Sequence, residues 1–230
     1  MSPLNESQRV PLLCYVTDRR SLVAAEPAEV RDILLRKVAA AAAAGVDWIQ
    51  IREKDLSAKE CSALTRDVLQ LIANSVADVR SRARIVVNDR LDVALAVQAD
   101  GVHLGEKSLP PQEARRFVNL LRREKDFLIG ASCHSLEAAK VAEQDGADYL
   151  IFGPVFATPA KAVYGAPQGL EQLAEVCRAV ALPVLAIGGI TLENAASCLS
   201  AGASGIAVIR LFQDAGDMTA VVRALRRVSA

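Results

Sequence analysis

The sequence predicts a (β/α)8 TIM barrel formed by one domain over residues 1–230. The length of 230 residues suits a single barrel with short loops. Hydrophobic residues make up 52% of the chain and aromatic residues only 4%, which is typical of a parallel sheet of Val, Ile and Leu covered by helices. Short apolar runs also alternate with segments of helical periodicity, as repeated strand–helix units require.

The order of these segments predicts eight strands and about as many helices. Residues 1–10 are polar and are expected to form a loose tail. Strands are expected at residues 12–18, 48–53, 85–89, 101–105, 127–133, 149–155, 184–187 and 205–209. Helices are expected over residues 30–45, after a capping box formed by Ser57 and Glu60, over 91–97 and 191–200, and from near Pro111, Leu136 and Gly169.

A weak internal repeat supports closure into a barrel. Four related segments place a glycine just before a strand, at Gly45, Gly101, Gly146 and Gly202, separated by 56, 45 and 56 residues. Glycine at these positions is expected to cap the preceding helix before the chain turns into the sheet. A doubly wound open sheet is the competing architecture, and the even spacing of the units favours the barrel.

Composition narrows the function classes. The 27 basic and 27 acidic residues cancel, so we expect neither a nucleic-acid partner nor a membrane surface, but small-molecule substrates. The five cysteines contain no C-x-x-C pair and are expected to be reduced thiols of a cytoplasmic protein. The amino terminus lacks the apolar region of a signal peptide. Composition leaves the oligomeric state open, with a homodimer as one expectation.

Polar residues gather where the predicted strands end, which is where barrel enzymes carry their active sites. The polar candidate site residues are Gln50, Arg52, Lys54, Asn88, Asp89, Ser132, His134, Thr158, Lys161 and Arg210, and the candidates without a polar side chain are Gly188, Gly189 and Ile209. Arg52, Lys54 and Lys161 match the charge of a diphosphate. Asp89 is the expected ligand of a Mg²⁺ ion that bridges to the phosphates.

A second phosphate site is expected after the seventh strand. Gly188 and Gly189 carry no side chain there, so their N–H groups can approach an anion closely. A tight turn without a ligand is the competing interpretation of this pair. The charged residues also have competing interpretations, which are a solvated charge run from Arg52 to Asp55, a surface ion pair between Asp89 and Arg90 and a solvent-exposed Lys161. His103 is expected in the core.

Several of these segments resemble a known superfamily. The motifs are Y-V-T-D at 15–18, Q-I-R-E-K-D at 50–55, V-N-D-R at 87–90, D-G-V-H-L-G at 100–105, G-x-S-x-H at 130–134, G-P-V-F-x-T at 153–158, and A-I-G-G-I followed by Asn194. Together they are similar to thiamine phosphate synthases and to the TenI-type thiazole tautomerases, over roughly residues 12–213. The resemblance implies a (β/α)8 transferase that joins hydroxymethylpyrimidine diphosphate to a thiazole phosphate with Mg²⁺ and releases diphosphate.

The resemblance also implies residue roles. Gln50 would contact the pyrimidine, and Ser132 would steady the leaving group. The diphosphate would be held by Arg52, Lys54, Asn88 and Lys161, and the metal by Asp89, while Thr158, Gly189 and Ile209 would line the thiazole phosphate pocket.

Two positions depart from the synthase pattern. Ser108 stands where synthases carry a second acidic metal ligand, and Arg210 stands where they usually carry a serine. A tautomerase that uses His134 as a proton shuttle therefore remains an alternative, as does a phosphate-binding relative without activity. Retention of Asp89 and of the three cations favours the synthase, because a monophosphate substrate needs neither. Whether residues 156–168 form a lid is left open.

Overall fold

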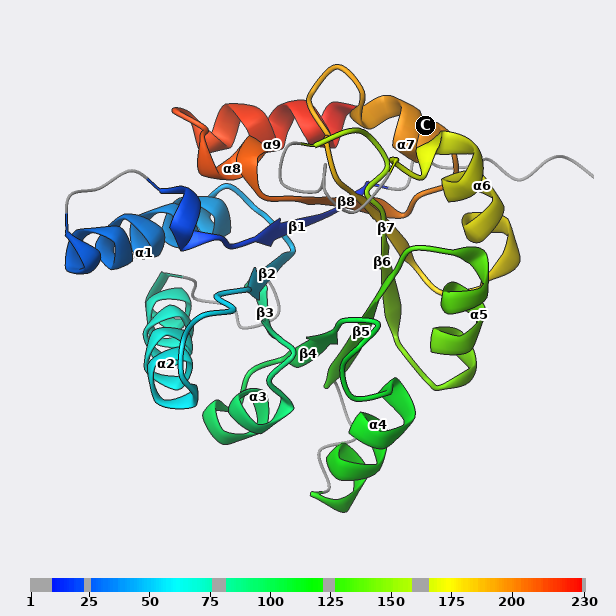
Figure 1. Cartoon of the computed structure of the whole chain (residues 1–230). Coiled ribbons are helices and arrows are strands. Elements are labelled where there is room, and N and C mark those ends of the chain that lie inside the picture. The colour runs from blue at the N-terminus through cyan, green and yellow to red at the C-terminus, as the bar shows by residue number, and fades with distance from the viewer. Residues whose placement is uncertain (1–9, 23–25, 76–81, 122–126, 159–165, 229–230) are drawn as a thin grey trace, which may run out of the picture.

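The computed structural model describes the chain over residues 10–22, 26–75, 82–121, 127–158 and 166–228. In these ranges it forms a closed barrel of parallel strands in sequence order, ringed by helices (Figure 1). The strands are β1 (Leu12–Val16), β2 (Trp48–Ile51), β3 (Arg84–Asn88), β4 (Gly101–Leu104), β5 (Leu128–Cys133), β6 (Tyr149–Phe152), β7 (Val184–Ile187) and β8 (Gly205–Val208). The predicted barrel is confirmed, and the open sheet is excluded because β1 pairs with β8.

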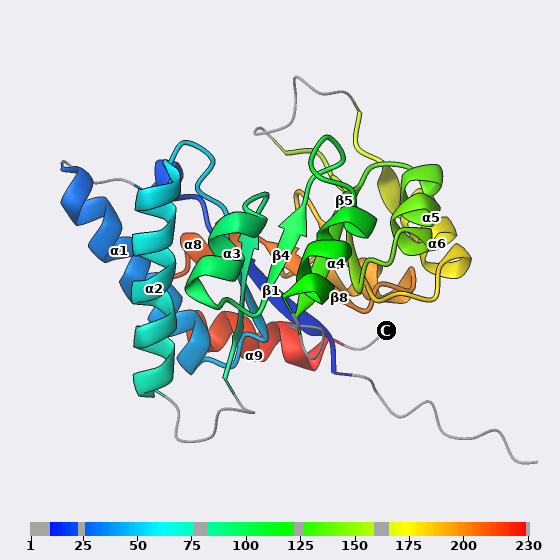
Figure 2. The ribbon, with the colours of Figure 1, turned by 90° about the horizontal axis from the view of Figure 1, so that it is seen from below.

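Helices connect and cover the strands, and the views in Figures 1 and 2 place them outside the ring. They are α1 (Pro27–Ala43), α2 (Ala58–Ser75), α3 (Leu91–Val97), α4 (Pro111–Leu120), α5 (Leu136–Gln144), α6 (Gly169–Ala179), α7 (Ala195–Ser200), α8 (Arg210–Gln213) and α9 (Met218–Arg227), with a 3-10 turn η1 (Arg19–Ser21) after β1. None of the helices in the described ranges combines the length and apolar composition that a membrane span requires.

Alternation along each strand sends neighbouring residues to opposite faces of the sheet. One set, which includes Cys14, Val16, Tyr149 and Leu185, packs in a buried cluster of its own. The second set packs with apolar side chains of the helices in a larger buried core. Both faces of the strands are therefore apolar, as parallel strands covered by helices require.

Several predicted boundaries were wrong by a few residues. Three strands, β1, β2 and β3, end before polar residues that were assigned to them, so Thr17, Arg52 and Asp89 lie in the loops that follow. The helix expected over residues 30–45 begins at Pro27, since proline is favoured in the first helical turn. The helix expected from residue 191 begins only at Ala195.

The capping role of Gly101 was also predicted wrongly. Gly45, Gly146 and Gly202 have φ values of +90°, +81° and +101°, as helix-ending glycines do. Gly101 instead lies in β4, where an added Cβ would clash with the Leu128 carbonyl oxygen. The left-handed position after α3 is taken by Gln98, with φ of 62°. Glycine is needed at Gly101 because two strands approach closely there.

Aspartates hold the amino ends of the strands together. Asp47, just before β2, accepts a hydrogen bond from the Leu13 N–H at 2.7 Å and pairs with Arg226 at 2.8 Å. The same arrangement recurs before β4 and β6, where Asp100 bonds Ile85 and Arg82, and Asp148 bonds Ile129 and Arg115. The repeat therefore marks three carboxylate–guanidinium clamps that join neighbouring strands at this end of the barrel.

Candidate functional site

Three predicted site residues from β2 and β3 form one hydrogen-bonded chain at the carboxyl end of the barrel. Gln50 Nε2 donates to Asn88 Oδ1 at 2.8 Å, and Asn88 Nδ2 donates to Asp89 Oδ2 at 2.7 Å. The parallel pairing of β2 with β3, which sets Gln50 opposite Val86, brings these ends together. Gln50 is buried, whereas Asp89 is exposed at the mouth.

The carboxylate of Asp89 sets the direction of the whole chain. An ionised carboxylate only accepts hydrogen bonds, so the Asn88 amide must turn its NH₂ group to Asp89 and its oxygen to Gln50. Gln50 therefore donates a hydrogen bond to Asn88 through its amide N–H. Its Oε1 atom is buried and has no hydrogen-bond partner in the described part of the chain. A buried acceptor without a donor is costly, so Gln50 Oε1 is a candidate acceptor for a hydrogen bond from a ligand.

Asp89 is held rigidly and kept ionised. Its Oδ1 accepts the Gly105 N–H at 2.9 Å and the Ser108 hydroxyl, and its backbone adopts a φ of 58°. Burial alone would raise the pKa of Asp89, but hydrogen bonds from Ser108, Gly105 and Asn88 and the charge of Lys54 hold the pKa below its usual value. The competing interpretation, a surface ion pair between Asp89 and Arg90, is wrong, because Arg90 bonds Asp92 at 2.6 Å.

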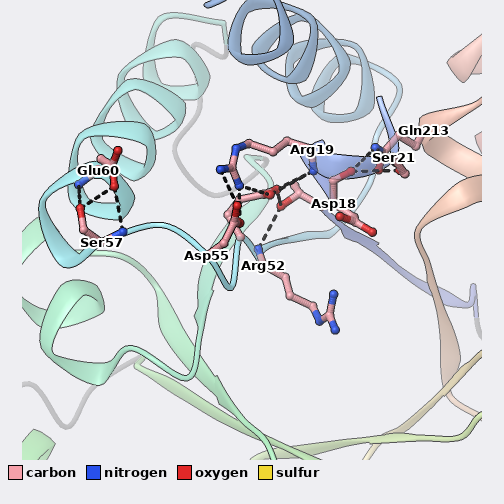
Figure 3. Close-up of polar contacts among 10 residues, drawn as sticks. Asp18, Arg19, Ser21, Arg52, Asp55, Ser57, Glu60 and Gln213 are labelled. Carbon is pink, nitrogen blue, oxygen red and sulfur yellow. Dashed lines mark hydrogen bonds and ion pairs between the residues drawn. The ribbon is translucent and has the colours of Figure 1, made fainter. Parts of the chain in front are cut away.

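Two predicted cations from the segment after β2 stand at the same mouth. Figure 3 shows the side chain of Arg52 extending away from the acidic residues around it, and its guanidinium has no ion pair within the described ranges. Lys54 is exposed and lines a cavity of about 230 Å³ together with Asn88 and Asp89. A larger depression of about 430 Å³ between α2 and α3 lies on the outer surface, away from these side chains.

The residue between the two cations behaves differently. Glu53 is buried, and it bonds Thr17 and Arg19 of the neighbouring β1 end. The interpretation of residues Arg52 to Asp55 as a solvated charge run is therefore wrong for Glu53. The sequence analysis did not predict a role for this residue. Glu53 and Thr17 carry no local signal, because both depend on a partner about one strand–helix unit away.

His103 lies inside the barrel, as predicted, and contacts a candidate site residue. Its Nε2 lies 2.8 Å from Ser132 Oγ and its Nδ1 lies 3.2 Å from the Tyr149 hydroxyl. Burial lowers the pKa of His103 to about 4, with a further lowering by Arg52 that the charge of Asp89 opposes. The imidazole is therefore neutral at pH 7 and joins Ser132 to Tyr149.

His134 and the segment after β6 form the opposite side of the mouth. The His134 ring contacts the Gly153 carbonyl oxygen through Nδ1, and its backbone N–H donates to Glu106 at 2.9 Å. Because a carbonyl only accepts, Nδ1 carries a proton and Nε2 is left for another partner. Thr158 is half-buried beside this segment. Lys161 and most of the proposed lid at 156–168 lie outside the described residues.

The paired glycines after β7 are required by close packing. An added Cβ on Gly188 would lie 2.5 Å from the Cβ of Pro154, and one on Gly189 would lie 2.6 Å from the Ala157 carbonyl oxygen. Both have positive φ, and Phe156 donates its N–H to the Gly188 carbonyl at 3.0 Å. A tight turn accounts for the hydrogen bond that the Gly188 carbonyl oxygen accepts. Binding of a phosphate by the N–H groups of the two glycines stays a prediction.

Ile209 and Arg210 begin the short helix α8 at the neighbouring strand end. Ile209 is half-buried and packs with the barrel interior. The Arg210 side chain is 70% exposed, and its Nε donates to Asp214 at 2.7 Å. Its guanidinium is therefore drawn along α8 toward Asp214, and its expected contact with a phosphate stays a prediction.

The donor set at Asp89 fits a hard divalent cation that is shared with a substrate. No cluster of three or more His, Cys, Asp or Glu side chains able to hold a metal exists within the described ranges. One ionised carboxylate oriented by Ser108 and Gly105 suits Mg²⁺, which commonly takes one or two carboxylates and completes its shell with phosphate and water oxygens. A closed protein cage of the structural zinc type does not fit.

The cysteines are poorly suited to nucleophilic chemistry, including Cys61, which lines the cavity beside Asp89. All five thiols are free, and burial raises the pKa of each, to about 12 for Cys14 and Cys133 and about 11 for Cys177 and Cys198. A thiol with a raised pKa is a poor nucleophile at neutral pH.

Comparisons with known proteins identify the family of the chain. A family model described as thiamine monophosphate synthase matches residues 15–212. A thiamine-phosphate synthase of Moorella thermoacetica is 44% identical over 194 residues, covering 84% of this chain and 87% of that protein. A Roseiflexus thiamine-phosphate synthase is 43% identical over 219 residues, covering 95% and 85%. The structure of thiamine phosphate pyrophosphorylase from Pyrococcus furiosus superposes with a TM-score of 0.76 at 35% identity, covering 96% of each chain. The chain therefore belongs to the thiamine monophosphate synthase family.

Proposed function

We propose that the protein is a transferase that makes thiamine phosphate. It joins the methylene carbon of hydroxymethylpyrimidine diphosphate to the ring nitrogen of hydroxyethylthiazole phosphate and releases diphosphate. The observation that carries this proposal is the Gln50–Asn88–Asp89 chain, together with an Arg52 guanidinium that forms no ion pair within the described ranges. It sets a buried acceptor, an oriented carboxylate and a free cation at one mouth, as a heterocycle with a diphosphate requires.

Each part of the first substrate has a proposed partner. The buried Oε1 of Gln50 would accept a hydrogen bond from the amino group of the pyrimidine. Arg52, Lys54 and Lys161 would neutralise the diphosphate, with hydrogen bonds from Asn88 and from the Ser132 hydroxyl that His103 orients. Asp89 would hold Mg²⁺, which when bound supplies positive charge to the phosphate oxygens.

The second substrate would lie on the β6–β8 side of the mouth. Its single phosphate would meet the backbone at Gly188 and Gly189, with Thr158, Ile209 and Arg210 beside it. In this arrangement the thiazole nitrogen would face the carbon from which diphosphate departs. Because charge builds up on the leaving group, positioned cations and hydrogen-bond donors carry the reaction and a strong general base is not required.

A two-substrate assay tests the proposal. The protein is mixed with both substrates, with and without Mg²⁺, and thiamine phosphate and diphosphate are quantified. We expect equal amounts of both products, only with both substrates and with a strong dependence on Mg²⁺. Turnover of a thiazole phosphate carboxylate alone, without metal and abolished by His134→Ala, would establish the tautomerase instead. Binding of both substrates without product would establish a non-catalytic relative.

Two coarser expectations belong with this proposal. The five free cysteines favour a reducing compartment, and we propose the cytoplasm. A homodimer is proposed as the assembly, and light scattering of the full chain measures it.

A further inference from the structure

A hydrogen-bonded cluster around the buried Glu53 carboxylate contacts the backbone from which Arg52 projects, and it has no role in the function proposed above. We infer that Thr17 and Glu53 are positioning residues that aim the Arg52 guanidinium into the barrel mouth. The inference rests on the proposed binding of diphosphate by Arg52. Figure 3 shows the cluster around Arg19 and Asp55, with the Arg52 side chain leading away from it.

Glu53 has all the partners that a buried carboxylate needs. Its side chain is 1% exposed. Its Oε1 accepts the Thr17 hydroxyl at 2.6 Å, and its Oε2 accepts the Arg19 N–H at 3.0 Å and the Arg19 guanidinium at 3.3 Å. Arg19 is held in turn by two bonds to Asp55, at 2.6 and 2.9 Å. Burial raises the pKa of Glu53 above its usual value, and the hydrogen bonds from Thr17 and Arg19 at another strand end counteract only part of that rise.

The hydroxyl of Thr17 transmits this anchoring to Arg52. Thr17 is fully buried, and its Oγ1 accepts the Arg52 N–H at 2.9 Å. Since the N–H of Arg52 can only donate and the carboxylate of Glu53 can only accept, the hydroxyl proton must point to Glu53. Consecutive hydrogen bonds polarise one another, so the bond from Thr17 to the Glu53 carboxylate strengthens the bond that the Thr17 hydroxyl accepts from the Arg52 N–H.

The hydrogen bond from the Arg52 N–H to Thr17 Oγ1 lies just beyond the end of β2. The Thr17 N–H still bonds the Gln50 carbonyl oxygen at 2.9 Å, but β2 ends at Ile51. For Arg52, the side chain of Thr17 takes the place of a backbone acceptor. Glu53 on the outer side and the Arg52 side chain on the inner side then alternate as strand residues do, although the strand has ended. A rigid backbone here fixes where the guanidinium can reach.

A further contact links the turn that carries Arg19 to α8. Gln213 of α8 is buried and donates to the Asp18 carbonyl oxygen and to Ser21 Oγ, the latter at 2.7 Å. The turn that carries Arg19 is thereby tied to the helix after β8. The backbone of Arg52 is therefore connected through hydrogen bonds to the end of β1 and, through the turn after β1, to the helix that follows β8.

Binding of inorganic diphosphate in the presence of Mg²⁺, measured by calorimetry on the full chain, tests this inference. Thr17→Val keeps the shape of the side chain but removes the acceptor, and we expect about tenfold weaker binding. Thr17→Ser restores the hydroxyl and is expected to bind within about twofold of the unmodified protein. Asp47→Asn is the matched control, because it weakens a comparable clamp at the other end of β2 and should leave diphosphate binding unchanged.

A double-mutant cycle separates positioning from general stability. If Thr17 acts through Arg52, Thr17→Val combined with Arg52→Ala binds no more weakly than Arg52→Ala alone. Additive losses, or a Thr17→Val protein that binds normally while Arg52→Ala does not, would overturn the positioning role. Unchanged binding by Arg52→Ala would instead overturn the proposed diphosphate site. Should Thr17→Val fail to fold, Glu53→Gln is judged by the same outcomes, because its amide would face the donors of Arg19.

Discussion

The two ends of the barrel differ in whether every polar side chain finds a partner, although both hold ion pairs, such as Arg19 with Glu53 at the carboxyl end. At the amino end, Asp47, Asp100 and Asp148 each accept a backbone N–H and pair with an arginine, so charge and hydrogen bonds are satisfied within the protein. At the carboxyl end, Arg52 has no ion pair in the described ranges and Gln50 keeps a buried oxygen without a donor. The contrast teaches that incomplete pairing, rather than the number of charges, marks the functional end.

The largest expected effect is a difference in catalytic rate between a variant at the carboxyl end and a variant at the amino end. Arg52→Ala should lower kcat/KM by roughly 10²–10³ because a cation that meets developing charge is lost, with little change in the free energy of unfolding. Arg82→Ala removes an arginine that is already paired to Asp100, so stability should fall while the rate stays within about twofold. Steady-state kinetics and urea unfolding on both variants check this. Equal rate losses would contradict the division between the ends.

The carboxyl half also carries a pH-dependent part of the stability. The folded state holds the pKa of His103 at about 4, below its value of about 6.5 in the unfolded chain, so the unfolded state takes up a proton first as pH falls. Stability is fully present above pH 6.5 and should decline by about 3 kcal/mol as the pH falls to 4. Urea unfolding across this range measures it. A His103→Asn variant that shows the same decline would assign it to other groups.

Breaking an amino-end clamp should affect stability alone. Asp100→Ala leaves the Ile85 N–H without its side-chain acceptor and Arg82 without its partner, which should cost about 2 kcal/mol of unfolding free energy. Thermal or urea unfolding measures the loss, and kcat measured below the transition should be unchanged. A selective loss of kcat in a fully folded variant would show that this end also influences the site.

The smallest expected effect concerns the metal position. Ser108→Ala removes one hydrogen bond from Asp89, so its carboxylate stays ionised at pH 7 but is less firmly oriented. The Mg²⁺ concentration for half-maximal rate should rise about threefold to tenfold, with a nearly normal rate at saturation. Titration of activity with Mg²⁺ checks this. Ser57→Ala, at the capping box of α2, is a surface control that should not shift the titration.

Local patterns in the sequence determined the barrel, the order of its strands and the strand ends at which Gln50, Arg52, Asn88 and Asp89 stand. Those features depend on periodicity and on short-range turns, which neighbouring residues encode. The capping box at Ser57 was predicted for the same reason, and it forms.

Only the tertiary structure decided which of these charges would be satisfied. The burial of Glu53 depends on Thr17 and Arg19, which lie 36 and 34 residues away. The clamps before β2, β4 and β6 depend likewise on arginines contributed by distant segments, such as Arg226 for Asp47. The free energy of a charged group is set by what surrounds it in space, so no local pattern separates the paired carboxylates from the cation left open at the mouth.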